Sequence, residues 1–302
     1  MLHVPDQSVS STPWLGITAK IAATVDDPAF APEHVIPIGG GCINQTYCLE
    51  GRGQRFFIKL NHARYLPMFA SESSGLQEIG QSTTLRVPRP ICHGIEQDFA
   101  WLALEFIPLQ NRGNQSELGM MLASMHHHTT DRFGWETDNT IGITLQKNTL
   151  TTDWISFWQQ HRLGFQLRLA RKNGYAGRLQ QLGERLMDNL AYFFDDLPAA
   201  SLLHGDLWSG NYAFTSTGQP VVFDPAVYYG DREADMAMTE LFGGFSADFY
   251  AAYQSAWPLD DGYRTRKQLY NLYHILNHLN LFGKHYLHQA ETTMEKLLAE
   301  IH

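Results

Sequence analysis

The spacing of the apolar residues changes near residue 107, and no other feature of the sequence constrains the fold as strongly. Before that point, short apolar runs alternate with glycine-containing turns, which predicts β-strands accompanied by helices at residues 14–25 and 65–82. Beyond residue 110, apolar residues recur at helical spacing, which predicts helices at residues 116–128, 153–172, 177–195, 232–256 and 263–300. We therefore expect a strand-rich part, residues 1–107, joined to a helix-rich part, residues 108–302.

The composition supports a globular protein of two domains or one large two-lobed unit. The chain has 302 residues, of which 44% are hydrophobic and 18% charged, so it can bury a sizeable core. No apolar run approaches the roughly 20 residues of a membrane helix, and the N-terminus lacks the pattern of a signal peptide. The formal charge is −9 without a basic cluster, so we expect no nucleic-acid partner and no membrane partner.

The chain contains only three cysteines, Cys42, Cys48 and Cys92. Their odd number and the absence of C-x-x-C spacing argue against a disulfide framework or a structural zinc site. This usage fits a reducing compartment, so we expect a cytoplasmic protein.

Two short apolar strands lie beyond residue 200, and they are the only strand signals in the helix-rich part. "NYAF" (211–214) and "VVF" (221–223) are separated by the turn-rich "TSTGQP", which predicts a hairpin. If Phe214 pairs with Val221, Asn211 lies opposite Asp224. Asp206 precedes Asn211 by five residues and can fold back over the same place. Three oxygen-bearing side chains then converge.

These side chains suit phosphoryl-transfer chemistry. Asn211 and Asp224 carry the oxygen ligands that magnesium prefers, and an aspartate beside them, Asp206, can accept a proton from a substrate hydroxyl. "HGDLWSGN" also matches the kinase catalytic-loop spacing H-x-D-L-x-x-x-N. The alternative is an ordinary polar turn, which the position of Asp224 disfavours. We expect His204 to pack inward, and Gly205 to supply a backbone angle that a side chain would resist.

Several features of the strand-rich part suit a nucleotide. Lys59 ends "FFIK", which resembles a kinase strand, and Glu72 lies 13 residues on, where it can pair with Lys59. A solvated strand end and helix face are the alternatives. The strand in "LALEFIP" leads to a hinge whose backbone can bind adenine, or it is simply a buried strand. "IGGGCIN" is a turn whose amides can approach phosphate, although taken alone it is better explained as an ordinary β-turn. The candidate nucleotide-binding residues are Gly39, Gly40 and Gly41 at the turn, and Glu105, Phe106 and Ile107 at the hinge.

The order of these motifs resembles the kinase-like phosphotransferases, and within them the fructosamine kinase (ketosamine-3-kinase) family. The resemblance is carried by "GGGCIN", "FFIK", "FASESSGL", "HGDLWSGN" and "VFDPAVYYGDREADMAM", and it covers nearly the whole chain from about residue 14. Trp208 and "FDPAVYYGDRE" separate this chain from aminoglycoside and choline kinases. The resemblance implies an α+β, two-lobed protein-kinase-like fold, in which a lobe with an antiparallel sheet and one main helix binds the nucleotide and a larger, mostly helical lobe binds the substrate.

The resemblance also implies ATP-dependent phosphorylation of the third-carbon hydroxyl of ketosamines, on small amines or on glycated proteins. This reaction destabilises the adduct and is interpreted as deglycation repair. Asp206 would be the base, Asn211 and Asp224 the Mg²⁺ ligands, Lys59 and Glu72 the phosphate-setting pair, and residues 105–107 the adenine edge. The alternatives are another small-molecule kinase on the same fold and a non-catalytic nucleotide-binding protein. Asp224 is followed by Pro225 rather than by Phe-Gly, so we expect no mobile switch of the protein-kinase type.

Three features admit two interpretations. Trp208 is a candidate for substrate contact. Asp231 and Arg232 are balanced between scaffold and substrate contact, whereas Asp235 favours a structural ion pair. Cys42 either fills the glycine turn or is a reactive thiol that bound ATP protects. The chain is expected to be a monomer or a homodimer. Consecutive histidines in "MHHHTT" point to different faces of a helix, so we expect no metal site there.

Overall fold

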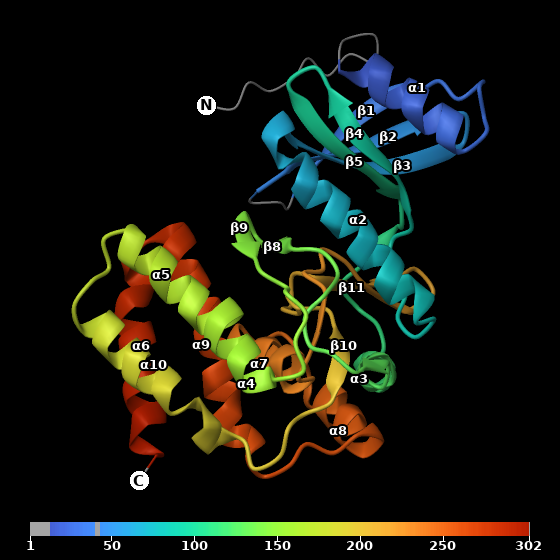
Figure 1. Cartoon of the computed structure of the whole chain (residues 1–302). Coiled ribbons are helices and arrows are strands. Elements are labelled where there is room, and N and C mark those ends of the chain that lie inside the picture. The colour runs from blue at the N-terminus through green and yellow to red at the C-terminus, as the bar shows by residue number, and fades with distance from the viewer. Residues whose placement is uncertain (1–12, 40–42, 302) are drawn as a thin grey trace.

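The computed structural model describes residues 13–39 and 43–301, and it shows an α+β architecture of two lobes (Figure 1). The smaller lobe contains a five-stranded antiparallel sheet with the strand order β1-β2-β3-β5-β4. Its elements are α1 (Trp14–Thr24), β1 (His34–Ile38), β2 (Gln45–Gly51), β3 (Gln54–His62), α2 (Leu66–Gln81), β4 (Pro90–Glu96) and β5 (Phe99–Glu105). The expected fold class is thereby confirmed.

One turn explains how β2 and β3 keep their register. Gly51 pairs with Gln54, so only Arg52 and Gly53 connect the two strands. Both residues have positive φ, 51° and 77°, which is the conformation of the tight hairpin turn that matches strand twist. This register places Lys59 opposite Thr46 in β2 and Leu102 in β5, at the centre of the sheet.

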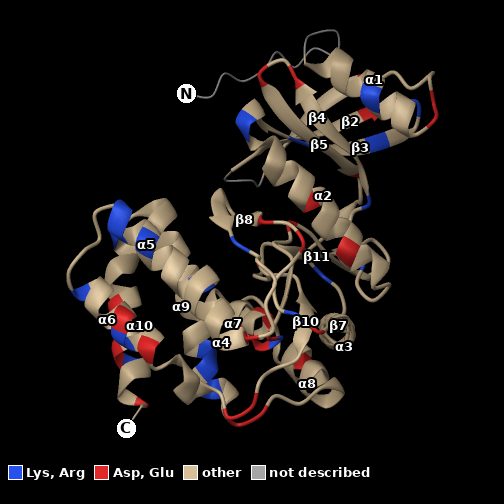
Figure 2. Ribbon diagram, in the orientation of Figure 1, with Lys and Arg blue, Asp and Glu red and all other residues tan. Residues whose placement is uncertain are grey.

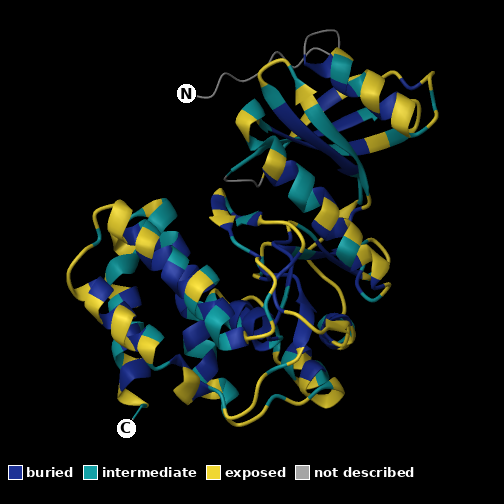
Figure 3. Ribbon diagram, in the orientation of Figure 1, coloured by how far each residue is buried: buried dark blue, intermediate teal, exposed yellow. Residues whose placement is uncertain are grey.

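The two faces of the sheet are covered by different helices. On one face, α1 contributes Trp14, Ile17 and Ile21 to a cluster that includes Trp101 and Ala103 of β5. On the other face, α2 contributes Met68, Phe69 and Leu76 to a cluster with Ala100, Leu102 and Leu104. Successive residues of β5 therefore alternate between two cores, as the period of two in a strand requires. Figure 3 shows β5 as mostly buried.

The larger lobe is built from helices around a second core. Most outer ends of the expected helices lie within two residues of the predicted bounds, but the helix expected at 177–195 ends at Asp188, and two of the expected helices are divided. The predicted helix 232–256 breaks at Gly243 and Gly244, which have φ of 72° and 98°, and the predicted helix 263–300 breaks at Gly283, with φ 95°. Left-handed φ values stop an α-helix, and glycine adopts them without steric cost. The helices are α3 (Gln115–His126), α4 (Trp154–Phe157), α5 (Gly164–Lys172), α6 (Arg178–Asp188), α7 (Glu233–Leu241), α8 (Ala247–Ala256), α9 (Tyr263–Phe282) and α10 (Leu287–Ala299), with a π-helical segment, Trp158–Leu163, between α4 and α5.

The larger lobe also contains short strands that the sequence pattern did not reveal. The expectation that "NYAF" and "VVF" were its only strands was wrong, because segments of two to four residues are too short to show alternation. They form three small antiparallel sheets, with the orders β13-β10-β7, β12-β11-β6 and β8-β9. Their bounds are β6 (Leu109–Gln110), β7 (Thr129–Thr130), β8 (Asn139–Ile141), β9 (Thr144–Gln146), β10 (Ala200–Leu203), β11 (Tyr212–Thr215), β12 (Pro220–Val222) and β13 (Tyr228–Gly230).

The predicted hairpin exists, but its register differs by one residue. Phe214 pairs with Pro220 rather than with Val221, and the carbonyl of Asn211 accepts a hydrogen bond from the amide of Phe223 (3.0 Å). The expected pairing requires an even number of loop residues, whereas Gly218, at φ 88°, closes an odd loop between Thr215 and Gln219. Asp224 consequently does not lie opposite Asn211 and leaves the strand with φ 58°.

The division of the chain at residue 107 remains a proposal. It is supported by β5, which ends at Glu105 in the sheet of the smaller lobe, and by β6, which pairs with β11 of the larger lobe. None of the helices in the described part of the chain is long and apolar enough to span a membrane.

Candidate active site

A cleft of about 820 Å³ lies between the lobes and collects most of the predicted site residues. Its lining comes from the sheet and α2 on one side, and from the 206–211 loop, the residues after β12, α7 and α9 on the other. Of the predicted residues, those that line it are Gly39, Lys59, Glu72, Glu105, Ile107, Asp206, Trp208, Asn211 and Asp224.

Lys59 is the buried cation of this cleft. Its side chain is 5% exposed, and Nζ lies 2.5 Å from Oε1 of Glu72 and 2.5 Å from Oδ1 of Asp224. Burial by itself would lower the pKa of Lys59, but the charges of Asp224 and Glu72 more than offset it and hold that pKa above its usual value. The predicted contact between Lys59 and Glu72 is confirmed, and the contact with Asp224 was not foreseen.

The loop that carries Asp206 follows directly from β10. Gly205 has φ 80°, and a Cβ at this position would lie 2.1 Å from the carbonyl oxygen of Ala226, so both the conformation and the space require glycine. His204 is fully buried, with Nε2 3.0 Å from the carbonyl of Phe223 and Nδ1 3.3 Å from the amide of Asp206. Burial lowers the pKa of His204, and the neutral Nε2–H form satisfies both contacts. The expected inward packing of His204 is confirmed.

The side chain of Asp235 in α7 binds the backbone of this loop. Its carboxylate accepts hydrogen bonds from the backbone amides of His204 (2.7 Å) and Gly205 (2.8 Å). It also receives Nε2 of His126 at 3.2 Å, while Nδ1 of His126 faces the hydroxyl of Tyr253 at 2.8 Å. Burial acts to raise the pKa of Asp235, but the donors from His126 and Gly205 outweigh it and keep that pKa below its usual value. The carboxylate is therefore ionised and fixes the loop electrostatically.

Asp206, Asn211 and Asp224 converge in the cleft despite the shifted register. Nδ2 of Asn211 donates to the carbonyl of Asp206 (2.8 Å), to its Oδ2 (3.3 Å) and to the carbonyl of Asp224 (3.5 Å). Burial and the nearby charge of Asp224 raise the pKa of Asp206 to about 7. A carboxyl with this pKa exchanges its proton near neutral pH, which suits a general base.

Trp208 projects into the cleft from the same loop. Its side chain is 39% exposed, and its ring meets Phe242 edge to face, with the ring centroids 6.4 Å apart. A Cβ on Gly210 would lie 2.3 Å from the Trp208 ring. The absence of a side chain at Gly210 therefore leaves room for the indole to lie against the loop.

The hinge residues divide between two environments. Glu105 and Ile107 line the cleft, and the Glu105 carboxylate contacts Arg86 (2.5 Å) and the amide of Arg89 (3.2 Å). The ring of Phe106 instead lies under the guanidinium of Arg55, at 4.6 Å. Gly39 lines the opposite edge. Gly40, Gly41 and Cys42 lie outside the described residues.

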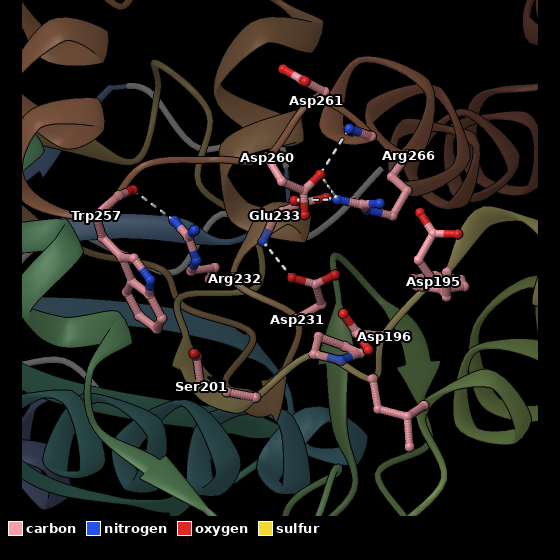
Figure 4. A pocket seen from close by; sticks show the side chains of 15 residues that line it. Asp195, Asp196, Ser201, Asp231, Arg232, Glu233, Trp257, Asp260, Asp261 and Arg266 are labelled. Carbon is pink, nitrogen blue, oxygen red and sulfur yellow. Dashed lines mark hydrogen bonds and ion pairs between the residues drawn. The ribbon is translucent and has the colours of Figure 1, made fainter.

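Asp231 and Arg232 do not line this cleft. They belong to a separate pocket, shown in Figure 4, that shares no lining residue with the cleft. Asp231 is buried against the hydroxyl of Tyr270 and the amide of Glu233, and Arg232 binds the carbonyls of Trp257 and Pro258. These bonds correspond to the scaffold interpretation of the two residues.

Sequence reasoning missed one wall of the cleft. It comes from β8, the end of α7 and the last turns of α9, and its aromatic members are Phe242, His274, His278 and Phe282. The ring of His278 lies 5.1 Å from Phe242 and 5.3 Å from Phe282. No local signal could have identified these residues, because they meet the 206–211 loop only through tertiary packing.

Comparison with known proteins places the chain in one family. The family model described as fructosamine kinase matches residues 14–300. A probable ketoamine kinase of Synechocystis sp. is 46% identical over 293 residues, covering 96% of this chain and 98% of that protein. A chloroplastic protein-ribulosamine 3-kinase of Arabidopsis thaliana is 43% identical over 266 residues, covering 86% of this chain and 81% of that protein.

Solved structures share the fold. A structure from Haemophilus somnus, provisionally named a fructosamine-3-kinase, superposes with a TM-score of 0.86 at 26% identity and covers 94% of this chain and 97% of its own. The choline kinase LicA of Streptococcus pneumoniae has a TM-score of 0.65 at 14% identity over 96% of this chain and all of its own, and it shares the kinase-like fold alone. Motifs, architecture and relatives agree, and the chain belongs to the fructosamine kinase family.

Proposed function

We propose that the protein is an ATP-dependent ketosamine 3-kinase, which phosphorylates the third-carbon hydroxyl of ketosamines on amines or protein lysines. The observation that carries this proposal is the convergence of Lys59, Asp206, Asn211 and Asp224 in a single cleft, in a chain whose relatives are named ketoamine and ribulosamine kinases. The proposed role is deglycation. Cys48 and Cys92 are free thiols, which fits the expected cytoplasmic setting.

The smaller lobe supplies the nucleotide contacts in this proposal. The Lys59 ammonium group is held in place by Glu72 and Asp224, and it exchanges part of its contact with Asp224 for a phosphate when ATP binds. The hinge backbone at residues 105–107 binds the adenine edge, and Gly39 lies at the entrance to the phosphate end of the cleft.

The oxygen donors fit a magnesium ion. Oδ2 of Asp224 and Oδ1 of Asn211 accept no hydrogen bond from any residue that the structure describes, and the Asp224 side chain is 47% exposed in the cleft. Magnesium takes one or two protein oxygens and completes its shell with phosphate and water. When bound by Asn211 and Asp224, it would neutralise charge that develops on the phosphates.

Asp206 acts on the acceptor in this proposal. Its carboxylate takes the proton of the third-carbon hydroxyl while the hydroxyl oxygen bonds to the γ-phosphorus and the bond to ADP breaks. The hydrogen bonds from the amides of His204 and Gly205 to Asp235 keep the Asp206 carboxylate in position. Trp208 and the aromatic wall exclude water and give the sugar an apolar surface.

The test is a panel of ribulose, erythrulose and fructose adducts of a lysine derivative, incubated with labelled ATP and magnesium. Choline and an aminoglycoside serve as competing acceptors, and Asp206→Asn serves as the matched inactive variant. We expect label on a ketosamine, with phosphorus NMR locating it on the third carbon. Transfer only to choline or the aminoglycoside would establish a different kinase, and nucleotide binding without any transfer would leave a non-catalytic protein.

A further inference from the structure

The larger lobe contains a second pocket on the far side of the catalytic loop. It encloses about 500 Å³ and shares no lining residue with the cleft. Three chain segments form it, namely residues 194–201 leading into β10, residues 231–233 at the start of α7, and residues 257–266 between α8 and α9. Figure 4 shows the side chains of these segments around one space, and Figure 2 shows acidic residues gathered on the loops that form its rim.

The charges of this pocket are strongly unbalanced. Six carboxyl groups and two guanidinium groups line it. Arg266 is occupied by Glu233, at 2.7 and 2.8 Å, and by Asp260 at 2.5 Å. Arg232 is directed at the hydroxyl of Tyr253 and at main-chain carbonyls. Neither arginine therefore neutralises the remaining acids.

Three exposed carboxylates of the rim have no partner. Asp195, Asp196 and Asp261 form no side-chain hydrogen bond or ion pair with any residue in the described ranges. They come from two loops at the rim of the same pocket, so their charges add there, although Figure 4 shows the Asp261 carboxylate directed outward. A protein with a formal charge of −9 places a substantial part of that excess at one pocket, which favours a cationic ligand.

Ser201 supplies an independent indication of a ligand. This residue of β10 is 0% exposed, and its Oγ has no hydrogen-bond partner among the described residues. Its side chain lines the pocket and rises from the strand toward the side where Arg232 and Trp257 lie (Figure 4). A buried hydroxyl without a partner costs free energy. A donor that reaches Oγ from the pocket, past the atoms that now cover it, would remove that cost.

The arrangement excludes a compact metal ion as the ligand. No group of three or more His, Cys, Asp or Glu residues in the described part of the chain is arranged to hold a metal ion, so the rim acids do not form a ready metal site. The rim also carries apolar surface, since Leu197 is 61% exposed beside Pro198. Spaced negative charges with apolar surface between them match ammonium groups that are separated by methylene chains.

We propose that this pocket binds an aliphatic ligand that carries several primary ammonium groups, as found in polyamines and in lysine side chains. Asp195, Asp196 and Asp261 attract the ammonium groups, Leu197 and Pro198 contact the methylenes, and Ser201 Oγ accepts a hydrogen bond from the innermost nitrogen. The pocket is independent of the proposed kinase reaction, because none of these residues lines the catalytic cleft.

The test is isothermal titration calorimetry of the full chain with spermidine and with trilysine, at low ionic strength and without nucleotide. We expect saturable binding of at least one of them, and weakening as salt screens the charges. Binding of spermidine alone would identify a free polyamine as the source, and binding of trilysine alone would identify a protein. Absence of saturable binding for both would overturn the proposal.

Two variants locate the site. Replacing the three rim acids together (Asp195→Asn, Asp196→Asn, Asp261→Asn) should weaken binding about 10- to 100-fold, since each exposed pair contributes modestly. The matched control neutralises three exposed acids outside the pocket (Glu33→Gln, Asp188→Asn, Glu300→Gln), and it should retain the affinity within about twofold. Equal weakening in both triple variants would show a diffuse charge effect and would overturn the site.

Ser201→Ala separates ligand contact from folding. It should weaken binding about fivefold through the lost acceptor. The melting temperature of the unliganded protein should not fall, because Oγ has no partner among the described residues. Unchanged affinity in a variant that melts at the normal temperature would remove Ser201 from the site, and with it the evidence for a deep ammonium position.

Discussion

Nζ of Lys59 lies 2.5 Å from Oδ1 of Asp224, although the two residues are 165 positions apart in the chain. Lys59 belongs to the central strand of the smaller lobe, and Asp224 follows the hairpin of the larger lobe. The ion pair therefore spans the cleft and links the two halves of the proposed phosphate site. The contact between Tyr229 and Glu78 of α2, at 2.7 Å, adds a second link between the lobes.

Lys59→Met should remove ATP binding and also destabilise the fold. Glu72 is buried, with a side chain 10% exposed, and loses its cation. Removing one partner of a buried pair typically costs about 3–5 kcal/mol, and the partial exposure of Asp224 reduces the effect here. Urea unfolding and ATP titration would measure the two effects. Double replacement with Glu72→Gln is the control, and it should recover stability without recovering ATP binding.

Asp206→Asn should leave ATP affinity nearly unchanged and lower kcat by about 10²–10⁴, the range for a general base. Single-turnover kinetics with labelled ATP would measure the loss. Asn211→Ala is a useful comparison, because it should raise the magnesium requirement as well as lower the rate. Near-normal turnover by Asp206→Asn would contradict the assignment of the base.

Asp206 should also make the protein less stable as the pH rises. Its pKa is raised to about 7 in the folded state, against the ordinary value of 3.8, so the folded protein binds more protons than the unfolded chain between these values. Stability attributable to this group therefore falls from about pH 4 to pH 7, by an amount on the order of 4 kcal/mol. Asp206→Asn should be more stable than the parent at pH 8, with little difference at pH 4. Parallel stability curves across this range would show that the carboxyl is not perturbed.

The activity should rise with pH through the same group. A base must be deprotonated to accept the hydroxyl proton, so kcat/KM should have an ascending limb near pH 7 in the free enzyme. Magnesium brings positive charge, the nucleotide brings negative charge, and Lys59 exchanges part of its contact with Asp224 for a phosphate. The ascending limb of kcat should therefore lie at a different pH from that of kcat/KM. A pH profile of kcat/KM that is flat between pH 5.5 and 8 would contradict this role.

Asp235→Asn should loosen the catalytic loop without touching the substrate. The amides of His204 and Gly205 lose a charged acceptor, which costs about 1.5–3 kcal/mol of stability. We expect kcat to fall about tenfold while the KM for ATP changes little. His126→Phe is the control, because it removes one donor to Asp235 but leaves both backbone bonds. A variant Asp235→Asn that loses stability but retains full kcat would show that the residue is only structural.

Local sequence patterns predicted the chemistry of the site and most of the elements. Short-range spacing of apolar residues predicted the change from strands to helices near residue 107. It also predicted the strand that carries Lys59 and the helix that carries Glu72. Gly205 was predicted for the same reason, since a left-handed φ is a property of one residue and its immediate neighbours. Short-range rules missed strands such as β10 and β13, because these segments are defined by pairing with distant strands: β13 pairs with β10, and β10 also pairs with β7.

Relations between distant segments were decided by tertiary structure. The hairpin register depends on the conformation of Gly218. The contact of Lys59 with Asp224 depends on how the two lobes pack together. Asp235 acts on the loop from 30 residues away, and the aromatic wall comes from α7 and α9. Asp231 and Arg232 lie four and three residues before Asp235, yet they line a different pocket, because the start of α7 faces the α8–α9 loop. Sequence by itself determined which functional groups the chain carries, because composition and local spacing are properties of the chain. Only the packed structure decided which of them meet, because contacts between distant segments depend on the packing of the whole fold.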